Sequence, residues 1–495
     1  MVRKTINVDY NSNISWSLSK TGFVAQSGEL KNLLANELIQ AFLESSDGKL
    51  WCSNSTTWYL RPDGSFRGCG YNALGQQGSG NTTVVKYFTR RASNVKDAAC
   101  SVNTTWYITN NGDLYGCGSG GNGQQGDGNA SNVTTFTQRA LNVKSVACSK
   151  NATWYITNDG DLYGCGDNTY GQQGSGNTTN VLTFTQRASN VKSVVCSEKT
   201  TWYVTNDGDL YGCGENKYNA QGSGDTTNVT TFTKRASNVK YVVCSNATTW
   251  YITNDGNLYG CGLNGDGQQG SGNKNNVTTF TQRASNVKSV VSSLYTTWYI
   301  TNNGDLYGCG DGGYGQQGNG STSDVTTFTQ KTSDVKSVAS SMYTTWYILN
   351  NGELYGCGYN SDGQQGSGNT NNVLTFTRRL YNVKTVVCSD DTTWYVTNDG
   401  DLYGCGDARY NQQGMSSTDD VTSFTKQDTG LSGLSANLTI NPNPADAIVV
   451  IDGDITTSKS VNQGKLINYS VSKDGYTPKS ESVRIYEDTT LDVSL

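Results

Sequence analysis

The sequence predicts an all-β protein whose main part is a closed β-propeller of eight four-stranded units, each 48 residues long. One observation is that each unit contains four short runs of β-branched and aromatic residues, bounded by turns rich in Gly, Asn and Asp. Another is that no unit has the period of about 3.6 residues that marks an amphipathic helix. The units are counted from eight tryptophans at intervals of 48 residues: Trp58, Trp106, Trp154, Trp202, Trp250, Trp298, Trp346 and Trp394.

Residues 1–46 do not repeat, and they are expected to form a separate N-terminal segment. Ser27 is a candidate N-cap, and the apolar residues between Leu30 and Phe42 recur at helical spacing. This pattern predicts one amphipathic helix of about four turns. Two roles are open for it: a cap packed on the propeller, or an attachment or oligomerisation element.

The repeated unit is clearest in the fourth copy, where Val191–Ser197, Thr200–Asn206, Asp209–Gly214 and Thr231–Arg235 are the four expected strands. The Asp-Gly pair after Asn206 predicts a two-residue hairpin turn between the second and third strands. The same template returns from about Asp47 to about Gln427.

The stretch Asp161-Leu-Tyr-Gly-Cys-Gly-Asp-Asn-Thr-Tyr-Gly-Gln-Gln-Gly174 resembles the core of the RCC1 repeat, and the resemblance covers roughly residues 47–430. It implies a closed β-propeller, which in that family usually has seven blades. The eight complete units of this chain favour eight blades, with seven as the alternative. Leu431 to Ala436 lie where a ninth first strand would fall, and they are expected to help close the ring.

The chain departs from the RCC1 pattern at positions that matter for function. The tryptophan of the family is replaced by cysteine in every Gly-Cys-Gly, and the leucine by the second Gln of Gly-Gln-Gln-Gly. Nucleotide exchange on a small GTPase and ultraviolet sensing, which members of the family perform, therefore cannot be carried over.

The C-terminal part differs in composition, because three of the four prolines lie there (Pro442, Pro444 and Pro478) whereas the last cysteine is Cys405. The stretch from Leu438 to Gly453, with the later Gly475-Tyr476, resembles the PEGA module, a small β-sandwich. That resemblance implies a spacer or docking role without catalysis. The expected domains are 1–46, a propeller over 47–434 and a PEGA-like β module over 435–495.

Composition excludes several function classes. The 36 Lys and Arg against 41 Asp and Glu give a net charge of -5, so neither nucleic acid nor an acidic membrane surface is an expected partner. The chain has no His, which removes Ser/His/Asp triads and imidazole metal sites. No apolar run is long enough to insert into a membrane, and no export signal is recognisable.

The cysteines form two sets, one in each Gly-Cys-Gly and one in six of the first strands, with Ser292 and Ser340 in the other two places. We expect buried free thiols that act as small hydrophobic side chains, with neither a disulfide framework nor a metal site. The repeated Gly-Gln-Gln-Gly lacks the lysine and helix of a phosphate-binding loop, so we expect no cofactor.

The loops differ in how far they vary among the units. The loops from first to second strand and from third to fourth strand vary, for example Glu198-Lys199 and Asp390-Asp391, whereas the other two connections stay nearly constant. Antiparallel strands place the variable loops on one face of the propeller. Unconstrained drift would explain variation, but tyrosine next to Asn, Asp and Gly is typical of a recognition surface. The candidate binding residues are Tyr71, Tyr170, Tyr218, Tyr295, Tyr314, Tyr343, Tyr359 and Tyr410.

These patterns favour a non-enzymatic binding head that recognises a protein or a glycan on another cell or particle. The terminal segments would attach it to a larger assembly, as in a surface adhesin or a phage virion appendage, at the extracellular surface or on the virion. One alternative is an intracellular, cytoplasmic RCC1-like scaffold for a protein partner. Another is an enzyme with carboxylates clustered at the central channel of the propeller.

Overall fold

The computed structural model describes residues 4–7, 15–19, 22–25, 48–427, 435–462, 466–484 and 489–495. Two compact units are distinguished: Lys49–Gln427, and Met1–Gly48 together with Asp428–Leu495. Within the described ranges the structure consists of strands and turns, and no helix there is long and apolar enough to cross a membrane. The helix predicted between Ser27 and Phe42 lies outside the described residues.

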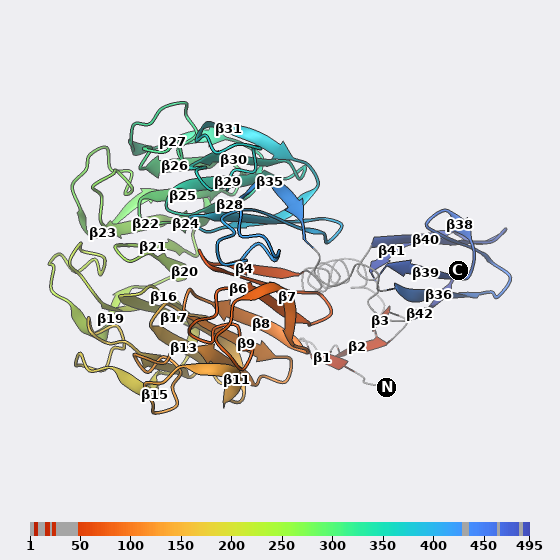
Figure 1. The fold of residues 1–495 in the computed structure, drawn as a ribbon, viewed down its shortest axis with the longest axis horizontal. Helices are drawn as coiled ribbons and strands as arrows, with labels where there is room; N and C mark the ends of the chain where they lie inside the picture. Colours follow the sequence, from red (N-terminus) through yellow and green to blue (C-terminus); the bar gives the residue numbers. More distant parts are fainter. Residues whose placement is uncertain are drawn as a thin grey trace. The chain divides into compact units, whose positions relative to one another are not determined.

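Eight four-stranded antiparallel sheets follow one another in the unit Lys49–Gln427, and each takes its strands in sequence order (Figure 1). The predicted all-β class and the count of eight blades are confirmed. We number the blades 1 to 8. They comprise β4–β7 (Lys49–Cys52, Thr56–Leu60, Phe66–Gly70, Val85–Ala92), β8–β11 (Val95–Cys100, Thr104–Thr109, Leu114–Gly118, Val133–Ala140), β12–β15 (Val143–Cys148, Ala152–Thr157, Leu162–Gly166, Val181–Ala188), β16–β19 (Val191–Cys196, Thr200–Thr205, Leu210–Gly214, Val229–Ala236), β20–β23 (Val239–Cys244, Thr248–Thr253, Leu258–Gly262, Val277–Ala284), β24–β27 (Val287–Ser292, Thr296–Thr301, Leu306–Gly310, Val325–Thr332), β28–β31 (Val335–Ser340, Thr344–Leu349, Leu354–Gly358, Val373–Leu380) and β32–β35 (Val383–Cys388, Thr392–Thr397, Leu402–Gly406, Val421–Lys426).

The ring closes by direct packing of blade 8 against blade 1. The first strands of neighbouring blades contact each other all the way round, including β32 with β4 and β4 with β8. At the junction, the Phe88 ring meets the Trp394 ring edge-on with centroids 5.7 Å apart. The expectation that Leu431 to Ala436 close the ring is wrong. Ser435 and Ala436 begin β36 (Ser435–Asn443) of the C-terminal sheets, and 431–434 lie outside the described residues.

The core of the propeller lies between neighbouring blades. Each of the eight repeated tryptophans is fully buried. In blade 4, Trp202 packs with Val204 of its own sheet and with Val242 and Tyr251 of blade 5. Its partner across the strand pair is Gly212, where an added Cβ would lie 2.3 Å from Trp202 Cζ3. Only glycine leaves room for the indole at this position.

The thiols of the Gly-Cys-Gly strands join each blade to the one before it. All eight are free, buried cysteines, and burial raises the pKa of each well above its usual value. Cys213 Sγ donates a hydrogen bond to the backbone carbonyl of Gln172 at 3.3 Å, and Cys69 Sγ donates to the Gln412 carbonyl across the junction at 3.3 Å. The six first-strand cysteines are also free. They are half-buried, whereas we expected them to be buried.

The nearly constant connections are held by hydrogen bonds, which explains why they vary little. Asn190, in the turn between blades 3 and 4, has a φ of 60°, which Asn tolerates better than most residues. Its carbonyl accepts from the Asn206 amide at 2.9 Å, and its side-chain amide donates to Asp207 at 2.7 Å. The hairpin between second and third strands differs from the expected two-residue turn: Asn206, Asp207 and Gly208 form the loop, with only Gly208 at positive φ, as in a type I turn followed by a glycine bulge.

The C-terminal residues form two small sheets around their own core. The strand orders are β39-β36-β42 and β38-β37-β40-β41, and the core includes Leu438, Ile440, Val449, Ile451 and Ile467. The described N-terminal strands β1, β2 and β3 form a third sheet. The bounds of these elements are Lys4–Asn7, Ser15–Ser19 and Gly22–Ala25 for β1–β3, and Ser435–Asn443, Ile448–Ile451, Asp454–Ile455, Ser458–Asn462, Leu466–Ser472, Lys479–Arg484 and Thr489–Ser494 for β36–β42.

Replacing the glycine beneath a buried tryptophan should destabilise the propeller. We expect Gly212→Ala to lower the free energy of unfolding by about 1–3 kcal/mol, because the new methyl group overlaps the Trp202 ring. Urea and thermal denaturation followed by tryptophan fluorescence would measure the loss. Gly121→Ala is the matched control, because no atom lies within 4 Å of a Cβ built at Gly121. Equal stability of the two variants would contradict this account of the core.

Candidate recognition surface on the variable loops

The variable loops of all blades lie on one face of the propeller, which we call the variable-loop face. It comprises the loops from first to second strand and from third to fourth strand; the other two connections form the constant face. The antiparallel strand order in every sheet gives this arrangement. Hydrogen bonds also join the two kinds of variable loop across blades: Gln172 Nε2 donates to the Glu198 carbonyl at 3.2 Å, and Gln412 Nε2 to the Asn54 carbonyl at 3.1 Å.

Four of the predicted tyrosines form a cluster on blades 6 and 7. The Tyr314 ring meets Tyr343 edge-on at 5.1 Å and Tyr359 edge-on at 5.0 Å, and Tyr295 stacks on Tyr343 at 6.3 Å. Tyr314 is 38% exposed, and the other three are half-buried. We call this group the tyrosine cluster. It gives the face a rigid aromatic surface, because each ring is held by its neighbours.

A tyrosine pair spans the junction of the ring. The rings of Tyr71 in blade 1 and Tyr410 in blade 8 meet edge-on with centroids 5.0 Å apart, and Tyr410 is 42% exposed. The two residues stand near opposite ends of the propeller sequence. Closure of the ring therefore creates this part of the surface.

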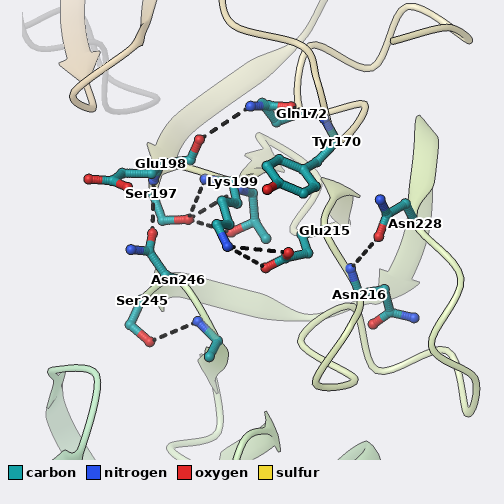
Figure 2. Close-up of polar contacts among 12 residues, drawn as sticks. Tyr170, Gln172, Ser197, Glu198, Lys199, Glu215, Asn216, Asn228, Ser245 and Asn246 are labelled. Atoms are coloured by element: carbon teal, nitrogen blue, oxygen red, sulfur yellow. Dashed lines mark hydrogen bonds and ion pairs between the residues drawn. The ribbon is translucent and has the colours of Figure 1, made fainter.

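The remaining two tyrosines, Tyr170 and Tyr218, both act on Lys199 between blades 3 and 4. Figure 2 shows Tyr170 beside this lysine. Lys199 Nζ lies 5.0 Å from the centre of the Tyr170 ring and 3.3 Å from Glu215 Oε2. Partial burial opposes the charge of Lys199, but the Glu215 carboxylate outweighs it and raises the pKa of the ammonium group. Tyr218 also acts on Lys199 electrostatically, and it accepts a cation–π contact from Lys217 at 5.1 Å.

A group of carboxylates lies on blades 7 and 8. Burial first, and then repulsion from Asp362, Asp390 and Asp407, raises the pKa of the Asp391 carboxyl to about 6. Arg409 forms a two-bond ion pair with Asp407, with both N···O distances 2.9 Å. The variable-loop face is thus acidic beside Tyr359 and Tyr410. Among the described residues, no group of three or more Cys, Asp or Glu side chains has the arrangement of a metal site.

The structure places all eight predicted tyrosines on the variable-loop face, in three separate groups and not in one ring. Sequence reasoning missed the Lys199–Glu215 pair and the carboxylates around Asp391. The loops that carry these residues were recognised as variable. The contacts between loops could not be predicted, because they depend on which blades are adjacent. The tyrosines of this face can stack on planar or apolar surfaces of a ligand. Its carboxylate, amide and phenol groups can form hydrogen bonds with the ligand.

Comparison with known families identifies the two parts of the chain separately. Residues 143–172 match the regulator of chromosome condensation (RCC1) repeat, so the predicted RCC1-like repeats are confirmed. Residues 436–494 match the family described as head fiber dimeric protein-like domain. This match replaces the expected PEGA module, whose short Gly- and Pro-containing motifs are not specific enough to separate small β domains.

One curated relative is the head fiber dimeric protein of Bacteroides phage crAss001, 49% identical over 57 residues. The match covers 12% of this chain and 47% of that protein, so the chain spans about half the length of the curated relative.

Solved structures show the same propeller fold. Human WBSCR16 is 18% identical with a TM-score of 0.53, and the match covers 65% of this chain and 95% of that chain. Yeast RCC1 (Prp20), solved with Kap60 bound, is 16% identical with a TM-score of 0.51, and the match covers 64% of this chain and 83% of that chain. At these identities the likeness establishes the fold alone.

The raised pKa of Asp391 makes a pH-dependent stability prediction. The carboxyl is easier to protonate in the folded chain than in the unfolded chain. Its contribution to the free energy of unfolding is therefore fully present below the unfolded pKa of 3.8, and it is lost as pH rises through about 6. We therefore expect Asp391→Asn to raise the melting temperature at pH 8 and to match the wild type below about pH 4.

Thermal denaturation between pH 3.5 and 8 would measure this difference, with Asp474→Asn as the control at an exposed carboxylate of the C-terminal sheets. A melting temperature of Asp391→Asn that follows the wild type at every pH would contradict the assignment.

Proposed function

We propose that this chain is a non-enzymatic binding head of a phage virion fibre. In this proposal the C-terminal sheets hold the chain in the virion as a dimer, and the variable-loop face recognises a protein or glycan on the host cell. The observation that carries the proposal is the joining, in one chain, of a domain matching the head fiber dimeric family with a propeller whose tyrosines gather on one face.

The attachment role is supported by the C-terminal match. The matched family and the curated relative are both described as head fiber dimeric proteins, and the relative belongs to a phage. A dimer would present two propellers from one attachment point. Two weak binding faces that reach the same cell reinforce each other through a raised effective concentration.

The recognition role is supported by the composition and packing of the variable-loop face. Tyrosine rings that are already packed against each other lose little conformational entropy on binding. The tyrosine cluster and the Tyr71–Tyr410 pair both include an exposed ring, Tyr314 and Tyr410. Stacking on such rings together with hydrogen bonds from neighbouring carboxylates suits sugar hydroxyls and the polar surface of a protein.

The charges near the tyrosines narrow the class of ligand. Asp390, Asp391 and Asp362 lie on the blades that also carry Tyr359 and Tyr410. Because carboxylates repel anions, this part of the face favours a neutral ligand over an acidic one. A neutral glycan is therefore the ligand class that we favour within the proposal.

Removing tyrosines from the variable-loop face should abolish cell binding without unfolding the chain. We expect the triple variant Tyr218→Ala, Tyr314→Ala, Tyr410→Ala, with one tyrosine from each group, to lose binding to intact bacterial cells, Bacteroides among them, and to a glycan panel. Fluorescence cytometry and glycan-array binding would measure the loss, and circular dichroism and melting would check the fold.

The matched control also removes three exposed tyrosines, at Tyr87, Tyr381 and Tyr476, none of which lies on the variable-loop face. This control should bind as the wild type does. Equal loss in both variants, or no binding by the wild type to any cell or glycan, would contradict the recognition role. Cleavage of a bound glycan would contradict the non-enzymatic part of the proposal.

The attachment role makes a prediction about mass. We expect the full-length chain to form a dimer of twice its 53.3 kDa at micromolar concentration, because the matched family is described as dimeric. Light scattering coupled to size-exclusion chromatography would measure the mass. A monomer that persists as the concentration is raised would contradict this part of the proposal.

A further inference from the structure

A lysine occupies the second position of the first strand in seven of the eight blades, and the recognition surface makes no use of it. These residues recur every 48 positions, on β8, β12, β16, β20, β24, β28 and β32, close to the constant face. We call them the lysine ring. Its members are Lys96, Lys144, Lys192, Lys240, Lys288, Lys336 and Lys384.

A β-bulge lies at the position of each of these lysines. In blade 4, Val191 pairs with Thr205 and Ser193 pairs with Val204, so Lys192 is the residue without a partner in the ladder. The same register shift occurs in all seven blades that carry the lysine. A bulge redirects a side chain, and the shared register shift gives the seven lysines the same position in their strands.

Two of the lysine side chains reach from one first strand to the next around the axis of the propeller. First strands of adjacent blades contact each other, so they are the innermost strands of the ring. Lys192 Nζ lies 3.4 Å from the carbonyl oxygen of Lys240, and Lys336 Nζ lies 3.1 Å from the carbonyl oxygen of Lys384. The valine before each lysine is buried between blades, whereas six of the lysines are exposed and Lys384 is half-buried.

Carboxylates lie near this ring in the turns of the constant face, but direct ion pairs with its lysines are few. Asp97 is the single acidic residue in the first strands, and it pairs with Lys49 of blade 1 at 2.9 Å. In the adjacent turns, Asp207 and Asp334 accept hydrogen bonds from asparagine amides, as do Asp159, Asp255 and Asp399 of equivalent turns. Within the described part of the chain, no ion pair involves Lys96, Lys144, Lys192, Lys240, Lys288 or Lys336.

We propose that the lysine ring is a binding site for a compact anion that carries several phosphate groups, held at the axis of the propeller. Lysine is a flexible point charge that binds phosphate well without a fixed approach geometry. Like charges arranged in a circle repel one another and their positive potentials add at the centre, so one multivalent anion bound there relieves the repulsion of several lysines. The site lies near the constant face. It does not depend on the proposed cell recognition, which uses the variable-loop face.

Inositol hexakisphosphate is the probe for this site. We expect the full-length chain to bind it with one molecule per propeller in calorimetry, to melt at a higher temperature in its presence, and to lose binding in about 1 M salt, where the Debye length is about 3 Å. The variant Lys192→Gln, Lys240→Gln, Lys288→Gln should bind it about tenfold more weakly or worse, because three neighbouring ammonium contacts are lost.

The control variant Lys86→Gln, Lys150→Gln, Lys217→Gln removes the same total charge at exposed lysines outside the ring, and its affinity should stay within about twofold of the wild type. A second ring variant, Lys96→Gln, Lys144→Gln, Lys336→Gln, should repeat the loss. Equal weakening in ring and control variants, or no binding by the wild type, would overturn the proposal. Tighter binding of a single-stranded DNA oligonucleotide or a polyglutamate peptide at the same ionic strength would overturn the assignment to a compact phosphate ligand.

Discussion

The whole propeller depends on the packing between one blade and the next. No blade buries its tryptophan alone: Trp202 packs on Val204 of its own sheet and is covered by Val242 and Tyr251 of the following blade, and the same contact recurs around the ring. This packing requires a glycine opposite the indole, and the buried cysteine after that glycine donates a hydrogen bond to the preceding blade. Because each repeat is stabilised mainly by its neighbours, a closed ring satisfies every interface and leaves no blade uncovered.

The same constraint divides the surface into two faces with different freedom to change. On the constant face, Asn190 and its equivalents adopt positive φ, and their backbone carbonyls accept hydrogen bonds from the neighbouring hairpins. The side-chain amide of Asn190 also donates to Asp207 of that hairpin. On the variable-loop face, the glutamines of Gly-Gln-Gln-Gly anchor the base of each loop, and the residues above them vary. A rigid framework with variable loops on one face is an arrangement in which binding residues can change without loss of the fold.

Much of this fold could be predicted from the sequence, because the period of 48 residues repeats every strand and turn signal eight times. The first strand of blade 4 was expected at Val191–Ser197 and is observed at Val191–Cys196. The hairpin loop was predicted one residue too short, since Asp207-Gly208 also occurs in three-residue loops with a glycine bulge. The prediction of a ninth first strand was wrong, because side-chain packing holds blades 8 and 1 together and they need no shared strand.

The candidate site was predictable as a list of residues, but not as an arrangement. Each of the eight tyrosines stands in a loop that the sequence marks as variable. The contacts between residues of different blades depend on which blades are adjacent after the ring closes. Examples are the contact of Tyr71 with Tyr410 and the carboxylates around Asp391. The lysine ring is periodic in the sequence, yet its meaning depends on the bulge and on the inner position of the first strands.

The central claim is that the chain binds its target through the variable-loop face. Hydrogen exchange followed by mass spectrometry, on the whole chain with and without envelopes of the bacterial cells selected by the cytometry assay, tests this claim most directly. The account predicts protection of the loops around Tyr314, Tyr343 and Tyr410, and unchanged exchange in the turns around Asn190 and its equivalents. Protection confined to those turns, or to the C-terminal sheets, would contradict it.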